Sequence, residues 1–236
     1  MEDFKNIKST VKYIAFDADD TLWDNEPYFR QGEEEFAKIM ANYASHHEIN
    51  QILFKTEIDN IPLYGYGVKA FVLSMIEAAS KIGGILITRE HIDAILDIGK
   101  RQIEAEVTLL PNITQVLAAL QQHFRLIVAT KGDLLDQHRK LSKSGLGIYF
   151  HHIEIMTEKH VIDYQKMVKR LDIQASELMM IGNSLKSDVL PILELGGYAV
   201  HIPYHTTWQH EMIDHSVIHP RFMECRQASD LLAILL

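Results

Sequence analysis

Residues 11–24 read VKYIAFDADDTLWD, in which a largely apolar run of six residues leads directly into three aspartates within four positions. An apolar run of this kind is typical of a strand that is buried on both faces, as in a parallel sheet. Carboxylates at such spacing repel one another, and each one that is held out of water raises the cost further. The stretch therefore predicts a buried strand that ends at a site where a cation compensates the acids.

The charge of the chain limits its partners. Lys and Arg number 23 and Asp and Glu number 32, which gives a net charge of −9 over 236 residues. A surface of this sign repels nucleic acid and anionic lipid, so we expect neither as a partner. Hydrophobic residues make up 47% of the chain, which is the balance of a globular protein and argues against disorder.

The cysteine content and the N-terminus bear on the compartment. Cys225 is the only cysteine, which excludes an internal disulfide and fits a reducing environment. The N-terminal segment MEDFKNIKST has no apolar core of signal-peptide length, and no stretch approaches the roughly 20 apolar residues of a membrane span. We therefore expect a soluble, cytoplasmic protein.

Four further β-rich runs follow the first one, at residues 124–130, 151–156, 178–182 and 198–203. Helical patterns separate the last four runs, at 133–144, 161–171 and 187–195. This alternation predicts an α/β core with a doubly wound, Rossmann-like parallel sheet.

The interval between the first two strands is different, because residues 25–106 have helical periodicity throughout and far exceed a simple crossover. We expect an inserted all-helical domain at 25–106, with the α/β core formed by 1–24 and 107–236. Its internal breaks are expected near Pro62 and Gly65-Tyr66-Gly67, and near Gly83-Gly84.

Polar groups follow the predicted strands at their carboxyl ends, where open parallel sheets bind ligands. They are Asp17 and Asp19, Thr130-Lys131, Lys159, and residues 183–188. A carboxylate cluster there is tolerable if a hard divalent cation lies among the oxygens, and Mg²⁺ also accepts phosphate oxygens from a substrate. These acids therefore predict a Mg²⁺ site that acts on an anionic substrate.

The run Asp17-Ala18-Asp19-Asp20-Thr21 resembles the DxDxT signature of the haloacid dehalogenase-like (HAD) hydrolases of the capped phosphatase type. Three further motifs of the family have counterparts in order, at Thr130, at Lys159 and at Gly182–Asp188. The resemblance spans essentially the whole chain, and residues 25–106 look like the family's cap. Together the four motifs are much more specific than any one of them.

The resemblance implies a role for each matching residue. Asp17 would be the nucleophile that forms an aspartyl-phosphate, and Asp19 would be the general acid and then the general base. Thr130 and Lys159 would bind the phosphoryl oxygens. Asp17, the main-chain carbonyl of Asp19, and Asp188 would hold Mg²⁺. The implied function is hydrolysis of a small phosphorylated metabolite.

The chain departs from the family pattern at two places. Asn183 stands where many relatives have an acid, so we expect Asp188 to be the metal ligand and Asn183 to have a supporting role. His160-Val161 follows Lys159 where many relatives have a proline. A phosphomutase would need the same core residues, and a non-catalytic binding protein with a weakened metal site is a third hypothesis. A dehalogenase would have no use for a proton-transferring Asp19.

Several other residues have an ordinary structural interpretation. Asp20 is interpreted either as part of the signature or as a turn or helix-capping residue. Lys131 and Lys186 are expected to be surface charges. Tyr66 and Gly67 are interpreted either as a plain loop or as a segment that recognises the substrate. The oligomeric state and the substrate's identity stay open.

Overall fold

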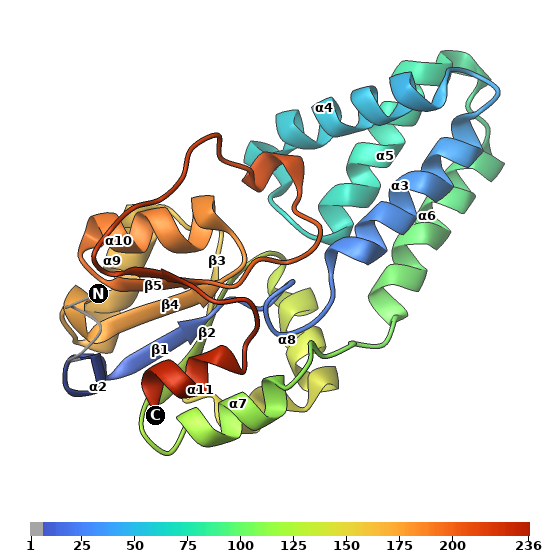
Figure 1. Ribbon diagram of the computed structural model, residues 1–236. Coiled ribbons are helices and arrows are strands. Elements are labelled where there is room, and N and C mark those ends of the chain that lie inside the picture. Colours follow the sequence, from blue (N-terminus) through green and yellow to red (C-terminus); the bar gives the residue numbers. More distant parts are fainter. Residues whose placement is uncertain (1–6) are drawn as a thin grey trace. The chain divides into compact units, whose positions relative to one another are not determined.

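The structure is a computed structural model that describes residues 7–236. The chain folds into two compact units (Figure 1). The core unit contains the described residues up to Glu26, Val107–Lys131 and Arg139–Leu236, and the helical unit contains Pro27–Glu106 and Gly132–His138. The division expected from the sequence differs from these units at residues 25–26 and 132–138.

The core unit is built on a six-stranded sheet in which every strand pairs in parallel, in the order β3-β2-β1-β4-β5-β6. The strands are β1 Tyr13–Phe16, β2 Arg125–Lys131, β3 His152–Met156, β4 Leu178–Gly182, β5 Tyr198–His201 and β6 Phe222–Glu224. The prediction of a doubly wound parallel sheet is confirmed. The edge strand β6 was not predicted, because its three residues form no continuous apolar run and lie only partly buried or exposed.

Alternate residues of the strands supply two separate hydrophobic clusters, one on each face of the sheet. In β1, Ile14 and Phe16 join the first cluster, whereas Tyr13 and Ala15 join the second. The helices of the core unit are α2 Ile7–Thr10, α7 Ile113–Leu120, α9 Val161–Leu171, α10 Leu190–Leu195 and α11 Asp230–Leu235 (Figure 1). The helix α8 Leu134–Ser144 begins in the helical unit and ends in the core unit. α7 and α11 pack in the first cluster and α9 and α10 in the second, so β1 is covered on both faces.

The helical unit packs around a core of its own. Its elements are α3 Glu26–Met40, α4 His46–Tyr64, α5 Val68–Gly83, the 3₁₀ turn η1 Gly84–Leu86, and α6 Arg89–Glu104. Fully buried side chains from each long helix meet in one cluster, among them Phe36, Leu53, Met75 and Ile95. Apolar residues at helical spacing thus give each helix one face to bury.

The breaks inside the helical unit follow local chemistry. α4 begins with a capping box, in which Ser45 Oγ accepts from Glu48 N and the Glu48 carboxylate accepts from Ser45 N. Pro62 lies inside the last turn of α4 and does not end it. The helix ends at Tyr64, and Gly65 follows with a φ of 70°, which glycine adopts without strain.

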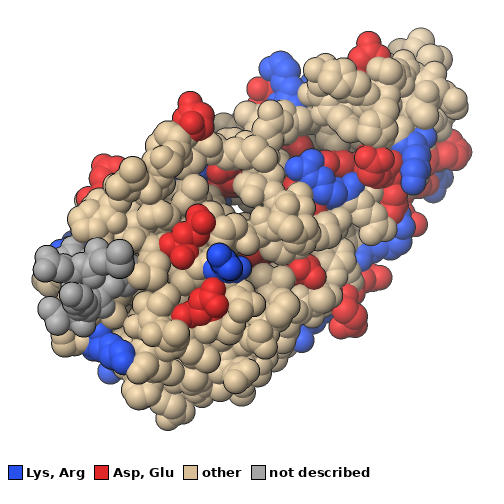
Figure 2. All heavy atoms as spheres, viewed as in Figure 1, with Lys and Arg blue, Asp and Glu red and all other residues tan. Residues whose placement is uncertain are grey.

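Charged side chains of both signs lie on the face of the molecule that Figure 2 shows. On the face in Figure 2, Asp and Glu are spread across the molecule and Lys and Arg occur singly or in small groups among them.

Within residues 7–236, no helix combines the length and the apolar character that crossing a membrane requires.

β1 and β4 are neighbours in the sheet although about 160 residues of chain separate them. The chain proceeds outward from β1 to β2 and β3 on one side, and from β4 to β5 and β6 on the other. Asp17 extends the pairing by one residue, because its N–H donates to Ile181 O at 2.8 Å. Ligands of doubly wound folds bind where the strand order reverses, and here that is the carboxyl end of β1 and β4.

Candidate active site

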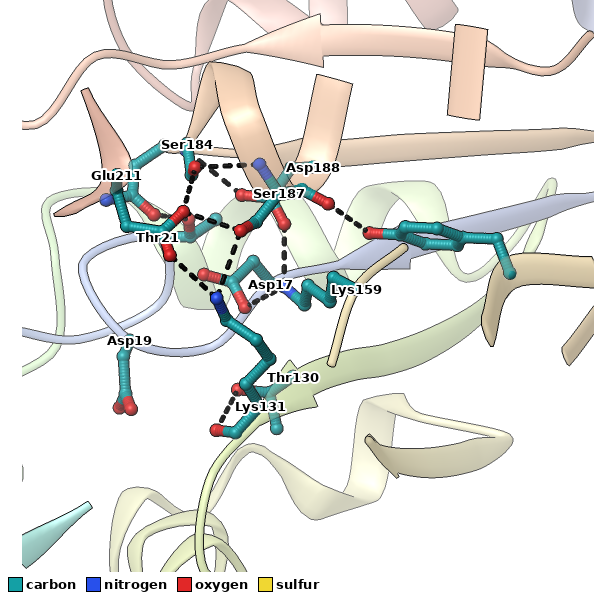
Figure 3. Close-up of polar contacts among 12 residues, drawn as sticks. Asp17, Asp19, Thr21, Thr130, Lys131, Lys159, Ser184, Ser187, Asp188 and Glu211 are labelled. Atoms are coloured by element: carbon teal, nitrogen blue, oxygen red, sulfur yellow. Dashed lines mark hydrogen bonds and ion pairs between the residues drawn. The ribbon is translucent and has the colours of Figure 1, made fainter. Parts of the chain in front are cut away.

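The structure brings the predicted polar residues to the carboxyl end of the sheet (Figure 3). Asp17 follows β1, Thr130 is the penultimate residue of β2, Lys159 lies three residues beyond β3, and Asp188 follows β4. All four are less than a tenth exposed. Parallel strands all end at one edge of the sheet, so residues far apart in sequence meet there.

Lys159 joins two of the acids. Its Nζ lies 2.5 Å from Asp17 Oδ1 and 2.6 Å from Asp188 Oδ1, and its side chain is 2% exposed. Burial alone would lower the pKa of Lys159, but the two carboxylates outweigh this effect and raise its pKa. Lys159 is therefore a fixed positive charge between two carboxylates.

Asp17 has an unusual proton affinity in this setting. Burial raises the pKa of Asp17 to about 7, the ammonium of Lys159 opposes the shift, and the carboxylates of Asp188 and Asp19 add to it. One ammonium and two buried carboxylates leave an excess negative charge. A divalent cation at this place would favour the ionised form of Asp17.

Asp188 is held by its own turn. It is fully buried in the π-helical turn η4, Leu185–Val189, and its Oδ2 accepts from the N–H of Ser184 at 3.0 Å. The carboxylate also packs directly on Gly182, where a Cβ atom would come within 2.1 Å of Asp188 Oδ2. The glycine of the Gly182–Asp188 motif is therefore needed for close approach.

The carboxylate of Asp19 has a different set of partners from that of Asp17. Asp19 Oδ1 accepts from Trp23 Nε1 at 2.7 Å and from Lys140 Nζ at 2.9 Å, and Lys140 also donates to Asn25 Oδ1 at 2.7 Å. The Asp19 side chain is 23% exposed. Sequence reasoning missed Trp23 and Lys140, and the regular spacing of α8 carries no signal that would single out Lys140.

Oxygen atoms of Asp17 and Asp19 converge on Asn183. With its amide nitrogen facing its acceptors, Asn183 lies 3.3 Å from Asp17 Oδ2, 3.2 Å from the main-chain oxygen of Asp19 and 3.2 Å from Thr21 Oγ1. His201 in turn lies 3.0 Å from the main-chain oxygen of Asn183. A cation here could use the carboxylate of Asp17 and the main-chain carbonyl of Asp19. In the opposite orientation of its amide, Asn183 would present its side-chain oxygen to the same place.

This donor set suits a hard cation, because Mg²⁺ takes oxygen ligands and retains several waters. Among residues 7–236, no three side chains of His, Cys, Asp or Glu group together as a metal site. A cation at Asp17 would thus depend on main-chain and amide oxygens as well as carboxylates. That Asp17, Asp19 and Asp188 are metal ligands and that Asn183 supports the site stays a prediction. The oxygen atoms present suit such a site.

Asp20 has a structural role. It adopts a left-handed conformation with φ of 59°, and its carboxylate accepts from Asn25 N at 2.8 Å and Glu26 N at 3.0 Å. Of its two interpretations, the turn and capping role is the one these bonds support. Burial raises the pKa of Asp20 to about 7, although the two main-chain donors oppose the shift.

The expectation for Lys131 was wrong. Its side chain is 14% exposed, and its Nζ lies 2.7 Å from Glu211 Oε1 and 3.0 Å from Ser187 Oγ. Lys131 is the last residue of β2, next to Thr130, so it lies at the same edge of the sheet as the site. Lys186, by contrast, makes an exposed hydrogen bond to His210 O. Glu211 lies in the loop after β5, and no sequence motif identifies it.

Tyr66 and Gly67 lie in the helical unit, between α4 and α5. Gly67 precedes α5 with a φ of 94°, and a Cβ there would lie 3.5 Å from Asp133 N. Lys69, in the first turn of α5, forms an ion pair with Asp133 at 2.7 Å. Tyr66 is partly buried. A role for this loop in substrate recognition stays a prediction.

Comparison with known proteins identifies the family. The protein-family model described as haloacid dehalogenase-like hydrolase matches residues 11–196 of this chain. A haloacid dehalogenase-like family hydrolase from Xanthomonas campestris is 32% identical, with a TM-score of 0.85 over 95% of this chain and 92% of that one. No curated protein matches the chain.

Two solved structures of lower identity share the fold. YfnB from Bacillus subtilis, solved bound to magnesium, is 20% identical with a TM-score of 0.64 over 96% of this chain and 99% of that one. A 2-haloacid dehalogenase from Pseudomonas syringae is 19% identical with a TM-score of 0.63 over 95% and 98%. From the family match and the 32% identical structure, we conclude that this chain is a hydrolase that belongs to the haloacid dehalogenase-like family.

Proposed function

We propose that this hydrolase is a Mg²⁺-dependent phosphatase that acts on a small phosphorylated metabolite through an aspartyl-phosphate on Asp17. The observation that carries the proposal is the carboxylate of Asp19, two residues after Asp17, with Trp23 and Lys140 holding one of its oxygens. Release of an alcohol from phosphorus needs a proton donor, whereas release of a halide ion does not. A site with this second acid is better suited to phosphate esters.

The first chemical step forms a bond between a carboxylate oxygen of Asp17 and phosphorus, and the bond from phosphorus to the ester oxygen breaks. Asp19 gives its proton to the leaving alcohol. Lys159 offers a positive charge to the phosphoryl oxygens and Thr130 a hydroxyl. Both are buried, so their interactions with the phosphoryl group compete little with water.

In the second step water attacks phosphorus and the bond to Asp17 breaks, which releases inorganic phosphate and restores the carboxylate. Asp19, now ionised, takes the proton from that water. Asp17, the main-chain oxygen of Asp19 and Asp188 would hold the cation, with Asn183 in support. When bound, Mg²⁺ supplies positive charge that favours ionised Asp17 and offsets the charge of the phosphate.

We assign recognition of the leaving group to the helical unit, with Tyr66 and Gly67 as its contact loop. The net charge of −9 argues against nucleic acid and membrane surfaces as partners. The single cysteine favours the cytoplasm.

The test measures p-nitrophenol release from p-nitrophenyl phosphate after EDTA treatment and after addition of Mg²⁺ or Ca²⁺. We expect activity with Mg²⁺, none with EDTA and little with Ca²⁺, which takes more ligands at longer distances. Chloride release from 2-chloropropionate is measured in parallel. Chloride release without phosphatase activity would overturn the proposal. With a phosphorylated metabolite as substrate, transfer of the phosphoryl group to another hydroxyl of the metabolite in place of release as inorganic phosphate would indicate a mutase.

A further inference from the structure

The loop between β5 and β6 brings a buried acid to the edge of the site. The loop spans residues 202–221, and its only helical element is the short 3₁₀ turn η5, Gln209–Glu211. Glu211 ends this turn, and its side chain is 13% exposed. Long loops with little regular structure inside a compact domain are commonly functional.

Glu211 receives three donors (Figure 3). Its Oε1 lies 2.7 Å from Lys131 Nζ, and its Oε2 accepts from Ser184 Oγ at 2.6 Å and from Ser187 Oγ at 2.5 Å. Burial opposes ionisation, but Lys131 and the two hydroxyls outweigh it and lower the pKa of Glu211 to about 2. The residue is therefore an anion with both oxygens engaged.

The two serines connect Glu211 to Asp188. Ser184 donates its main-chain N–H to Asp188 Oδ2 at 3.0 Å, and its Oγ accepts from the N–H of Ser187 at 3.0 Å. Both serines flank or belong to the π-helical turn that carries Asp188. π-Helical turns are rare and occur frequently at functional sites, and here the partners of the turn include the carboxylate of Glu211.

We infer that Glu211 is a positioning residue of the catalytic site, which ties Lys131 at the end of β2 to the turn Ser184–Asp188 and so sets the orientation of the Asp188 carboxylate. The inference rests on the proposed function, in which Asp188 is a metal ligand. Groups that orient a ligand without touching the metal contribute about 10–100-fold to its affinity.

A positioning role for Glu211 and a role that only stabilises the loop have different effects on Mg²⁺ binding. A purely structural contact would lower the melting temperature equally with and without Mg²⁺. A positioning contact must also reduce the rise in melting temperature that Mg²⁺ produces, because that rise depends on the dissociation constant of the metal.

The experiment compares the parent with Glu211→Ala, Glu211→Gln and the control Asp214→Asn. Asp214 lies three residues further along the same loop, its side chain is fully exposed, and its ion pair is with the exposed ring of the adjacent His215. Mg²⁺ affinity is measured by titration calorimetry and by the Mg²⁺-induced change in melting temperature. Asp188→Asn serves as the variant that loses the ligand itself.

We expect the Mg²⁺ dissociation constant to rise about 10–100-fold in Glu211→Ala and less in Glu211→Gln, which retains one acceptor oxygen, with Asp214→Asn at the parent value. Unchanged Mg²⁺ affinity in Glu211→Ala, beside a lower melting temperature, would overturn the positioning role alone. A parent protein that binds no Mg²⁺ would overturn the proposed metal site and this inference together.

Should Glu211→Ala fail to fold, Glu211→Gln and Lys131→Met decide the question. Lys131→Met removes the ion pair of Glu211 and the hydrogen bond from Lys131 to Ser187 Oγ, but it keeps the hydrogen bonds that Ser184 and Ser187 donate to Glu211. We expect Lys131→Met to reduce the Mg²⁺ affinity less than Glu211→Gln does, because the two serines form the connection to Asp188. The opposite ranking would contradict the proposed route through Ser184 and Ser187.

Discussion

The ammonium of Lys159 lies between Asp17 and Asp188, 2.5 Å from one carboxylate oxygen and 2.6 Å from the other, with almost no exposure to solvent. Without this charge two carboxylates would face each other inside the protein. The same ammonium is the group that we propose for binding the phosphoryl oxygens, so it has both a structural and a chemical consequence.

Replacing Lys159 by Met should destabilise the metal-free protein by about 3–5 kcal/mol, because the substitution removes the positive charge that compensates the buried carboxylates of Asp17 and Asp188. Mg²⁺ should recover part of this loss, since it would compensate the same carboxylates. Urea unfolding with and without Mg²⁺ measures both effects. Lys166→Met, which removes the ion pair of an exposed lysine with Asp163, is the control and should cost at most about 1 kcal/mol.

Gly182→Ala should abolish Mg²⁺-dependent turnover. The added methyl would come within 2.1 Å of Asp188 Oδ2, so the carboxylate must move away from its turn. Overpacking of this kind costs about 1–3 kcal/mol of stability, and the larger effect is expected on Mg²⁺ affinity. Gly147→Ala, where nothing lies within 4 Å of the new methyl, should match the parent in both assays.

The two acids that follow β1 should separate into distinct phenotypes. Asp17→Asn removes the nucleophile, so no phosphorylated protein should form. Asp19→Asn keeps the nucleophile and the main-chain oxygen but loses proton transfer, which is worth about 10²–10⁴-fold. An activated ester needs little protonation of its leaving group, so Asp19→Asn should still become phosphorylated and then hydrolyse slowly.

Rapid quench with a ³²P-labelled acyl phosphate measures this difference. Label should accumulate on Asp19→Asn and be missing from Asp17→Asn. Retention of label on the Asp17 variant, or turnover of both variants at the parent rate, would refute the assigned roles.

The stabilising effect of Glu211 should disappear in acid. Its pKa falls from 4.5 in the unfolded chain to about 2 in the fold, so the unfolded state binds the proton more readily. The ionised form therefore contributes roughly 3 kcal/mol at pH values above 4.5, and this contribution decreases as the pH falls toward 2. Urea unfolding of the parent and Glu211→Gln should differ most near pH 7 and progressively less below pH 4.5. A difference that grows in acid would contradict the ionised state of Glu211.

Tyr66→Ala should raise KM or lower kcat for a metabolite identified by screening a panel of phosphorylated compounds, and should spare p-nitrophenyl phosphate. The reason is that a recognition residue acts on the leaving group and not on the phosphoryl group. Tyr64→Ala is the matched control, because Tyr64 lies two residues away and its hydroxyl bonds Glu77 on the surface of the helical unit. Equal losses on both substrates would count against a recognition role.

Regular periodicity and apolar runs predicted the fold well. The runs at 11–16, 124–130, 151–156, 178–182 and 198–203 each contain or overlap an observed strand. Four of these strands, β1, β2, β4 and β5, are largely buried, and a strand that is buried on both faces requires a continuous apolar run. The breaks near Gly65–Gly67 and Gly83-Gly84 were equally visible, since glycines there follow helix ends. The strand β6 was not predicted, because it is an edge strand of only three residues.

For the site, the sequence by itself determined which groups stand at the carboxyl ends of the strands, because the strand positions place Asp17, Thr130, Lys159 and Asp188 there. Only the tertiary structure decided which side chains meet. It turned Lys131 inward to Glu211, joined Lys140 to Asp19, and packed Asp188 on Gly182. These contacts join segments whose separation in the chain follows no period, so their geometry depends on how loops cross the sheet edge, which local patterns of residues do not encode.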